Sequence, residues 1–171
     1  MTRFVSLILI LFFSFAMQET HSQNKNRTPC SAEPFKQFDF WVGNWNVYNV
    51  EDKLIGTNKI VKMSNACAIQ ENWESKTSNS KGTSYNYYNG LDKSWNQVWI
   101  DNNGGSLVLK GFFKNNQMIL KSDVVKNPKG NHYNQITWTQ NSDGSVTQLW
   151  EVFNEHHKKT GELFRGKYIR Q

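Results

Sequence analysis

Short segments in which apolar and polar residues alternate follow one another along most of this chain, and polar turn clusters such as Asn89-Gly90 separate them. After Gly43 we count about ten such segments, and turns that recur every ~8–12 residues are typical of an all-β meander. No stretch beyond residue 22 keeps a 3.6-residue apolar period, which disfavours a helical fold. The predicted strands lie near 44–50, 55–63, 67–76, 83–88, 95–101, 106–113, 118–125, 132–140, 146–153 and 162–170.

A flat meander of this many strands would leave two long unpaired edges. Closing the sheet removes them, so we predict a single antiparallel meander barrel. Eight strands give an interior that side chains just fill, whereas about ten strands leave a cavity. The dense apolar stretch Phe35 to Val42 predicts a short helical turn before the first strand.

The first 22 residues predict a signal peptide. Arg3 precedes an apolar run, Phe4 to Ala16, which is too short to cross a bilayer. Cleavage after Ser22 is favoured over cleavage after Ala16, and a retained anchor is the alternative. We therefore expect export to the periplasm or beyond, an exposed lead-in over 23–34, a barrel domain over 35–171 and no membrane span after the signal.

Two cysteines, Cys30 and Cys67, remain after the predicted signal. In an oxidising compartment an even pair predicts a disulfide, which would tie the lead-in to an early strand. Two buried free thiols are the alternative. No further Cys or His lies at ligand spacing nearby, so no metal site is predicted.

The chain of 171 residues carries 20 Lys and Arg against 14 Asp and Glu, a net charge of +6, and contains seven Trp. This aromatic content is untypical of a disordered chain. The positive charge alone would permit nucleic-acid binding, but no basic run or nucleic-acid motif is present, so that partner is not expected.

Residues 38–47, Phe-Asp-Phe-Trp-Val-Gly-Asn-Trp-Asn-Val, follow an F-D-F-W-x-G-x-W pattern. This pattern resembles the opening of a family of small secreted bacterial lipocalin-like (calycin-type) β-barrel proteins of unassigned function. The resemblance continues through 67–73, 95–101, 148–151 and 164–170, so it implies the same barrel for nearly the whole chain and says little about activity.

Gly43-Asn44-Trp45 is also similar to the G-x-W of lipocalins. The resemblance implies that Trp45 plugs one end of the barrel and that Arg170, from the last strand, stacks on it through a cation–π contact. Nitrobindins are related barrels that hold haem through a late-strand His. Here the last two predicted strands contain no His, and the pair His156-His157 falls in the polar loop between them, so no cofactor is predicted.

One side-chain pairing recurs on the predicted strands: an amide or carboxylate two residues before a Trp. Residues i and i+2 share a face of a strand, so each pair points the same way. An inward orientation would line the cavity with indoles and hydrogen-bonding groups, as a sugar requires. The alternative is core Trp beside solvated amides. The pairs are Glu71/Trp73, Gln97/Trp99 and Gln148/Trp150, with Asn134, Ile136 and Trp138 as a looser fourth set.

The net positive charge favours an acidic ligand, because a cleft of one sign concentrates ligands of the other. Arg165 and Lys167 share a face of the last predicted strand. We expect Arg165, with Gln97 and Gln148, to bind a ligand carboxylate. The alternative is that these cations are scattered and only keep the protein soluble.

An elimination reaction at a uronic acid would need few groups and no metal. A base removes the proton next to the carboxylate, while a cation or amide neutralises that carboxylate. We expect His132 or Tyr87 as base or acid, with Glu71 as a second proton-transfer group. A His at a strand start on the surface is the alternative for His132.

The leading prediction is therefore a secreted or periplasmic β-barrel that binds an acidic, uronic-acid-containing oligosaccharide in its cavity. A metal-independent carbon–oxygen lyase activity (dehydratase or β-elimination) in polysaccharide breakdown is the accompanying hypothesis. The rival is a non-catalytic lipocalin-like carrier of a small apolar ligand. A third option is an interaction module whose cavity is filled by its own side chains.

Overall fold

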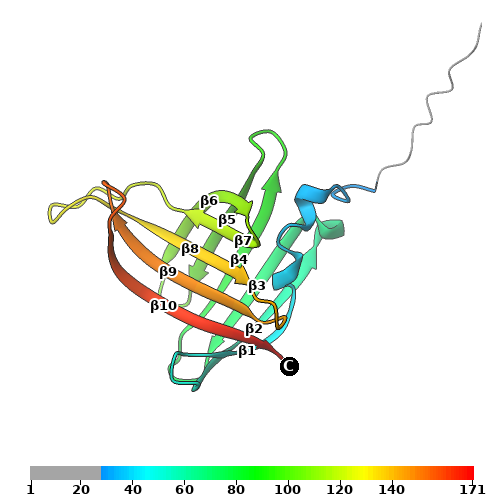
Figure 1. Cartoon of the computed structure of the whole chain (residues 1–171), viewed down its shortest axis with the longest axis horizontal. Coiled ribbons are helices and arrows are strands. Elements are labelled where there is room, and N and C mark those ends of the chain that lie inside the picture. Colours follow the sequence, from blue (N-terminus) through cyan, green and yellow to red (C-terminus); the bar gives the residue numbers. More distant parts are fainter. Residues whose placement is uncertain (1–27) are drawn as a thin grey trace, which may run out of the picture.

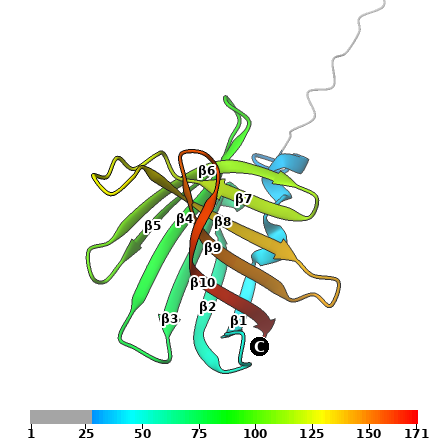
Figure 2. The same ribbon diagram turned by 60° about the vertical axis from the view of Figure 1, so that its left-hand side comes forward.

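The computed structural model describes residues 28–171, which form one closed barrel of ten antiparallel strands (Figure 1). Each strand pairs with its neighbours in sequence, and β10 lies beside β1 and pairs with it to close the barrel (Figure 2). The predicted meander barrel is thus confirmed. The predicted signal peptide, residues 1–22, and the start of the predicted lead-in over 23–34 lie outside the described residues.

The strands agree with the predicted segments in number and differ from them mainly at their ends. Residues 122–125, predicted as strand, lie outside β7, and β10 begins three residues earlier than predicted. The strands are β1 (Gly43–Tyr48), β2 (Leu54–Met63), β3 (Ala68–Ser75), β4 (Lys81–Asn89), β5 (Ser94–Asp101), β6 (Ser106–Lys114), β7 (Gln117–Lys121), β8 (His132–Gln140), β9 (Val146–Asn154) and β10 (Lys159–Arg170).

Two short 3₁₀ turns, η1 (Glu33–Lys36) and η2 (Asp39–Trp41), precede β1, as the apolar stretch predicted. Figure 1 shows these turns in blue, close to the strands. Phe38, which lies just before η2, and Trp41 of η2 are fully buried, and Phe38 packs against Trp95 of β5 and Trp138 of β8. The turns therefore close one end of the barrel with aromatic side chains.

Trp45 completes this plug. Its Nε1 donates a hydrogen bond of 2.8 Å to the carbonyl of Trp41, and the Arg170 guanidinium lies 4.4 Å from its ring centroid. Gly43 leaves room for that guanidinium, because a Cβ there would overlap an Arg170 nitrogen. The cation–π contact that the resemblance implied is confirmed.

The disulfide Cys30–Cys67 is also confirmed. It joins the segment before η1 to the junction between η3 (Ser64–Ala66) and β3, across a separation of 37 residues. In the loop-entropy model a link of this length stabilises the fold by about 3–4 kcal/mol. No helix between residues 28 and 171 has the length and apolar character needed to cross a membrane.

Candidate ligand-binding site

The barrel contains a cavity of about 410 Å³ that lies beyond the aromatic plug and opens between the β3–β4 and β5–β6 connections. Ligand pockets for small molecules fall in the range of roughly 300–1,000 Å³. Because side chains alternate along a strand, the three predicted pairs of a polar residue and a Trp all point into the interior of the barrel. The lining includes Glu71 and Trp73 from β3, Gln97 and Trp99 from β5, Trp138 from β8, Gln148 and Trp150 from β9, and Phe164 and Tyr168 from β10.

Two glycines make space for two of these indoles. A Cβ at Gly56 would overlap the ring of Trp73, and one at Gly82 would overlap the ring of Trp99. Each Trp thus lies over a glycine of the neighbouring strand, Trp73 over β2 and Trp99 over β4. Because these two glycines have no side chain, the indoles can lie close to the barrel wall.

Glu71 lies at the floor of the cavity and is 4 % exposed. Asn58 Nδ2 donates a hydrogen bond of 2.7 Å to Oε1, and Ser84 Oγ donates one of 2.6 Å to Oε2. Burial removes water from the carboxylate and raises the pKa of Glu71 to about 7, while these two hydrogen bonds lower it. A carboxyl with such a pKa can give or take a proton near neutral pH.

A chain of amides supports Ser84 from behind. Asn86 Nδ2 donates to Ser84 Oγ at 2.9 Å, and Gln97 Nε2 donates to Asn86 Oδ1 at 2.8 Å. All three residues are buried, and they come from the neighbouring strands β4 and β5. The network therefore fixes the orientation of the Glu71 carboxyl and of the Gln97 amide together.

Tyr168 forms the opposite side of the floor. Its hydroxyl donates to Gln148 Oε1 and lies 3.5 Å from Asn58 Nδ2. Burial raises the pKa of Tyr168 well above its usual value, and the nearby Glu71 carboxylate raises it further. Tyr168 therefore remains a neutral phenol that faces the same cavity as Glu71.

The outer part of the cavity is lined by polar residues and by Leu163, which is 60 % exposed. Asp101 lines it and accepts hydrogen bonds from the backbone N–H groups of Asn103 (2.8 Å) and Gly105 (2.9 Å), which hold the β5–β6 turn. Hydroxyl residues from the β3–β4 hairpin complete the rim: Ser75, Thr77, Ser78 and Ser80.

The structure brings seven of the ten predicted catalytic and binding residues to this cavity and places the other three elsewhere. Tyr87 is 43 % exposed on the outer face of β4, because the inward positions of that strand are Ser84 and Asn86. His132 begins β8 and lines a separate surface pocket with loop residues such as Asn127. Tyr87 and His132 therefore do not face the predicted partners.

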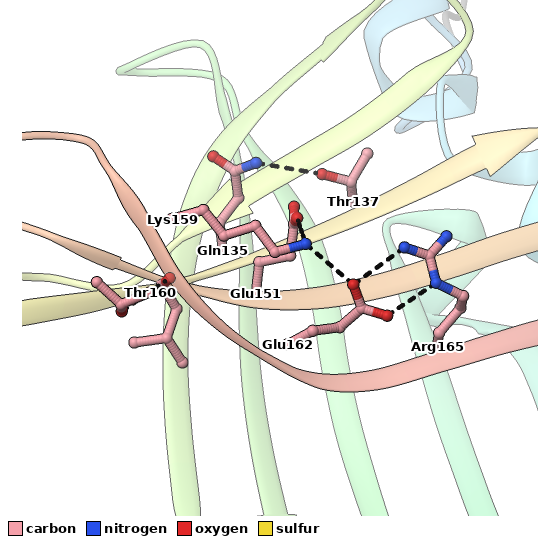
Figure 3. A network of polar contacts seen from close by, with 8 residues as sticks. Gln135, Thr137, Glu151, Lys159, Thr160, Glu162 and Arg165 are labelled. Carbon is pink, nitrogen blue, oxygen red and sulfur yellow. Dashed lines mark hydrogen bonds and ion pairs between the residues drawn. The ribbon is translucent and has the colours of Figure 1, made fainter.

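Arg165 is the third predicted site residue that lies outside the cavity. Inward positions on β10 are Phe164, Gly166 and Tyr168, so Arg165 projects from the outer wall. Its Nε and Nη2 donate to the Glu162 carboxylate at 2.8 and 3.0 Å, and Lys159 joins the same carboxylate at 2.9 Å, as Figure 3 shows. These hydrogen bonds, Arg165 first, lower the pKa of Glu162 to about 2. The cation expected in the cavity is thus bound on the outer wall.

Tyr168, Asn58, Ser84 and Phe164 are site residues that sequence reasoning missed. Strand alternation could have grouped Tyr168 with Phe164, but no sequence signal distinguishes the inner from the outer face of β10. Asn58 and Ser84 belong to the site only through their contacts with Glu71. Such contacts depend on strand register, which local sequence does not reveal.

The two histidines considered for haem lie in the β9–β10 turn. His157 Nδ1 is 3.0 Å from the Tyr133 hydroxyl and His156 is exposed, and neither lines the cavity. Within residues 28–171 no group of three His, Cys, Asp or Glu side chains is arranged to hold a metal ion. Comparison of the sequence with models of known families and with curated proteins gives no match.

Proposed function

We propose that this barrel binds a small saccharide in its open cavity. The observation that carries the proposal is that four indoles share one cavity with fixed amide, carboxyl and hydroxyl groups. A sugar ring presents C–H faces that pack on indoles, and its hydroxyls pair with donors and acceptors held in place. Trp73, Trp99, Gln97 and Gln148 supply both kinds of contact.

An apolar ligand fits this cavity less well. It would cover the Glu71 carboxyl and the Gln97 carbonyl oxygen without offering them a donor, and covering such groups with apolar surface costs free energy. The cavity also differs from that expected of an interaction module, because its own side chains leave it open. The polar floor therefore favours a ligand rich in hydroxyl or amino groups.

Elimination at a uronic acid is a second candidate function, and one observation favours it: the buried Glu71 carboxyl with a pKa of about 7. Ionised Glu71 would take the proton from the carbon next to the ligand carboxylate. The electron pair would form the C=C bond as the neighbouring C–O bond breaks, and Tyr168 would protonate the departing oxygen. The Gln148 Nε2 remains as an amide donor for the carboxylate, because Gln97 already donates to Asn86 and Ser84 and Arg165 does not reach the cavity.

Calorimetric titration with a panel of disaccharides tests the binding proposal, and ultraviolet absorbance of an unsaturated product tests elimination on the uronate-ended member. The variant Trp99→Leu removes one stacking surface and should weaken binding about fivefold to tenfold. Tyr85→Leu, an exposed aromatic on the outer face of β4, is the matched control and should bind as the wild type does. Absence of binding across the panel would refute the proposal.

A further inference from the structure

The charges that line the cavity have one sign, and it is opposite to that of the protein. Glu71 and Asp101 are its charged residues, and no Lys, Arg or His among residues 28–171 lines it. The protein carries a net charge of +6, but its described cations lie outside this cavity, and some of them, such as Lys110 with Asp92 at 2.6 Å, are paired on the outer wall. A charged ligand that enters this cavity meets carboxyl groups and no cation of the described residues.

The direction of the hydrogen bonds at the floor leads to the same result. Asn58 and Ser84 direct their donors to Glu71, and Gln97 uses its Nε2 for Asn86 and Ser84. The Gln97 carbonyl oxygen is thus the part of that amide left for a ligand. Asn58 Oδ1 lies behind Glu71, outside the cavity lining, and is buried without a hydrogen-bond partner among the described residues. The indole Nε1 of Trp138, a residue that does line the cavity, is a buried donor in the same situation.

The walls above this floor are aromatic. Trp73, Trp99, Trp138 and Trp150 surround the cavity, and indole faces attract cations more strongly than other side-chain rings do. Aromatic rings that surround a site with acceptor oxygens form the arrangement that holds organic ammonium groups. An ammonium has donors only, which matches the Glu71 carboxylate and the Gln97 carbonyl oxygen at the floor.

From this arrangement we infer that the saccharide bound in the cavity is an amino sugar with a free primary amine, whose ammonium group lies between Glu71 and the tryptophans. The inference rests on the proposed saccharide binding and specifies its ligand class. It reverses the sign of the ligand charge expected from the sequence, because the cations on which that expectation depended lie on the outer wall.

Binding of an ammonium group should also move a proton. Glu71 packs against Asn58 on β2 and Ser84 on β4, and the other titratable groups that line the cavity are Asp101 and Tyr168. Burial holds the pKa of Glu71 at about 7, so Glu71 is protonated in at least half of the protein molecules between pH 6 and 7. An adjacent ammonium stabilises the carboxylate, so the amine ligand releases that proton when it binds.

The test uses the glucosamine disaccharide with two free amines, its N,N′-diacetyl form and a uronate-ended disaccharide. Calorimetry should show the diamine binding about tenfold tighter than the diacetyl form, the size of a desolvated cation–π contact. Glu71→Gln should remove this preference, whereas Glu74→Gln, an exposed residue of the same strand that does not line the cavity, should retain it. Equal binding of diamine and diacetyl forms, or tighter binding of the uronate, would overturn the inference and leave saccharide binding intact.

A second measurement needs no variant. Titration of the wild-type protein between pH 6 and 7, in two buffers of different ionisation enthalpy, reports protons released on binding. Release with the diamine and none with the diacetyl form is the expected result, and equal proton release with both would refute the role of Glu71. If no saccharide binds at all, the proposed function itself fails, and the two failures are thereby distinguished.

Discussion

Replacing Glu71 by Gln should make the protein more stable at alkaline pH and leave its stability at acidic pH almost unchanged. The carboxyl is buried in a site without a cation, and burial raises its pKa from 4.5 to about 7. Below pH 4.5 the group is protonated in both folded and unfolded chains. As the pH rises towards 7 the unfolded chain loses the proton first, so the folded state loses stability.

The size of this effect follows from the pKa change. Each pH unit over which only one state is ionised is worth about 1.4 kcal/mol, so the wild type should lose about 3 kcal/mol from this group between pH 4.5 and 7. The amide of the Glu71→Gln variant would carry no charge and would avoid that loss.

Urea denaturation at a series of pH values from about 4 to 8.5 measures the effect as the difference between variant and wild type, which cancels the titration of all other groups. Glu74→Gln is the matched control on the same strand. Glu74 is exposed and pairs with Lys81 at 3.0 Å, and this pairing lowers the pKa of Glu74. Removing the Glu74 charge should therefore lower the free energy of unfolding only slightly and should not stabilise the protein at high pH. A difference for Glu71→Gln that stays constant with pH would refute the reasoning.

Three further changes test how the cavity and the fold are supported. Gly82→Ala should lower the free energy of unfolding by about 1–3 kcal/mol and weaken ligand binding, because its Cβ would displace the Trp99 ring. Gly90→Ala, which has open space around it, should change neither property. Equal urea midpoints for the two variants would contradict this prediction. Arg170→Met should lower the unfolding free energy by about 0.5–1 kcal/mol through loss of the contact with Trp45, measured in urea. Reduction of the Cys30–Cys67 disulfide should lower the free energy of unfolding by about 3–4 kcal/mol. A urea midpoint that does not change when reductant is added would count against the loop-entropy account.

Local sequence was sufficient for the strands and the barrel. Alternation with period 2 marks each strand, and turn residues mark the connections. A meander of this length removes its two unpaired edges by closing into a barrel. The same alternation grouped Glu71 with Trp73 and Gln97 with Trp99, and the structure places both pairs on one interior. The plug of Trp45 and Arg170 was anticipated from the resemblance of a short motif, Gly43-Asn44-Trp45, to the G-x-W of lipocalins.

Which face of each strand lies inside was decided only by the closed barrel. Alternation says that Arg165 and Lys167 share a face but not that the face is the outer one, and this distinction removed the expected cation from the cavity. The pKa of Glu71 likewise depends on neighbours from β2 and β4 and on exclusion of water by the whole wall. Sequence periodicity is a local property, whereas burial and charge environment arise from strands brought together over long distances, so the character of the ligand site emerged only from the tertiary structure.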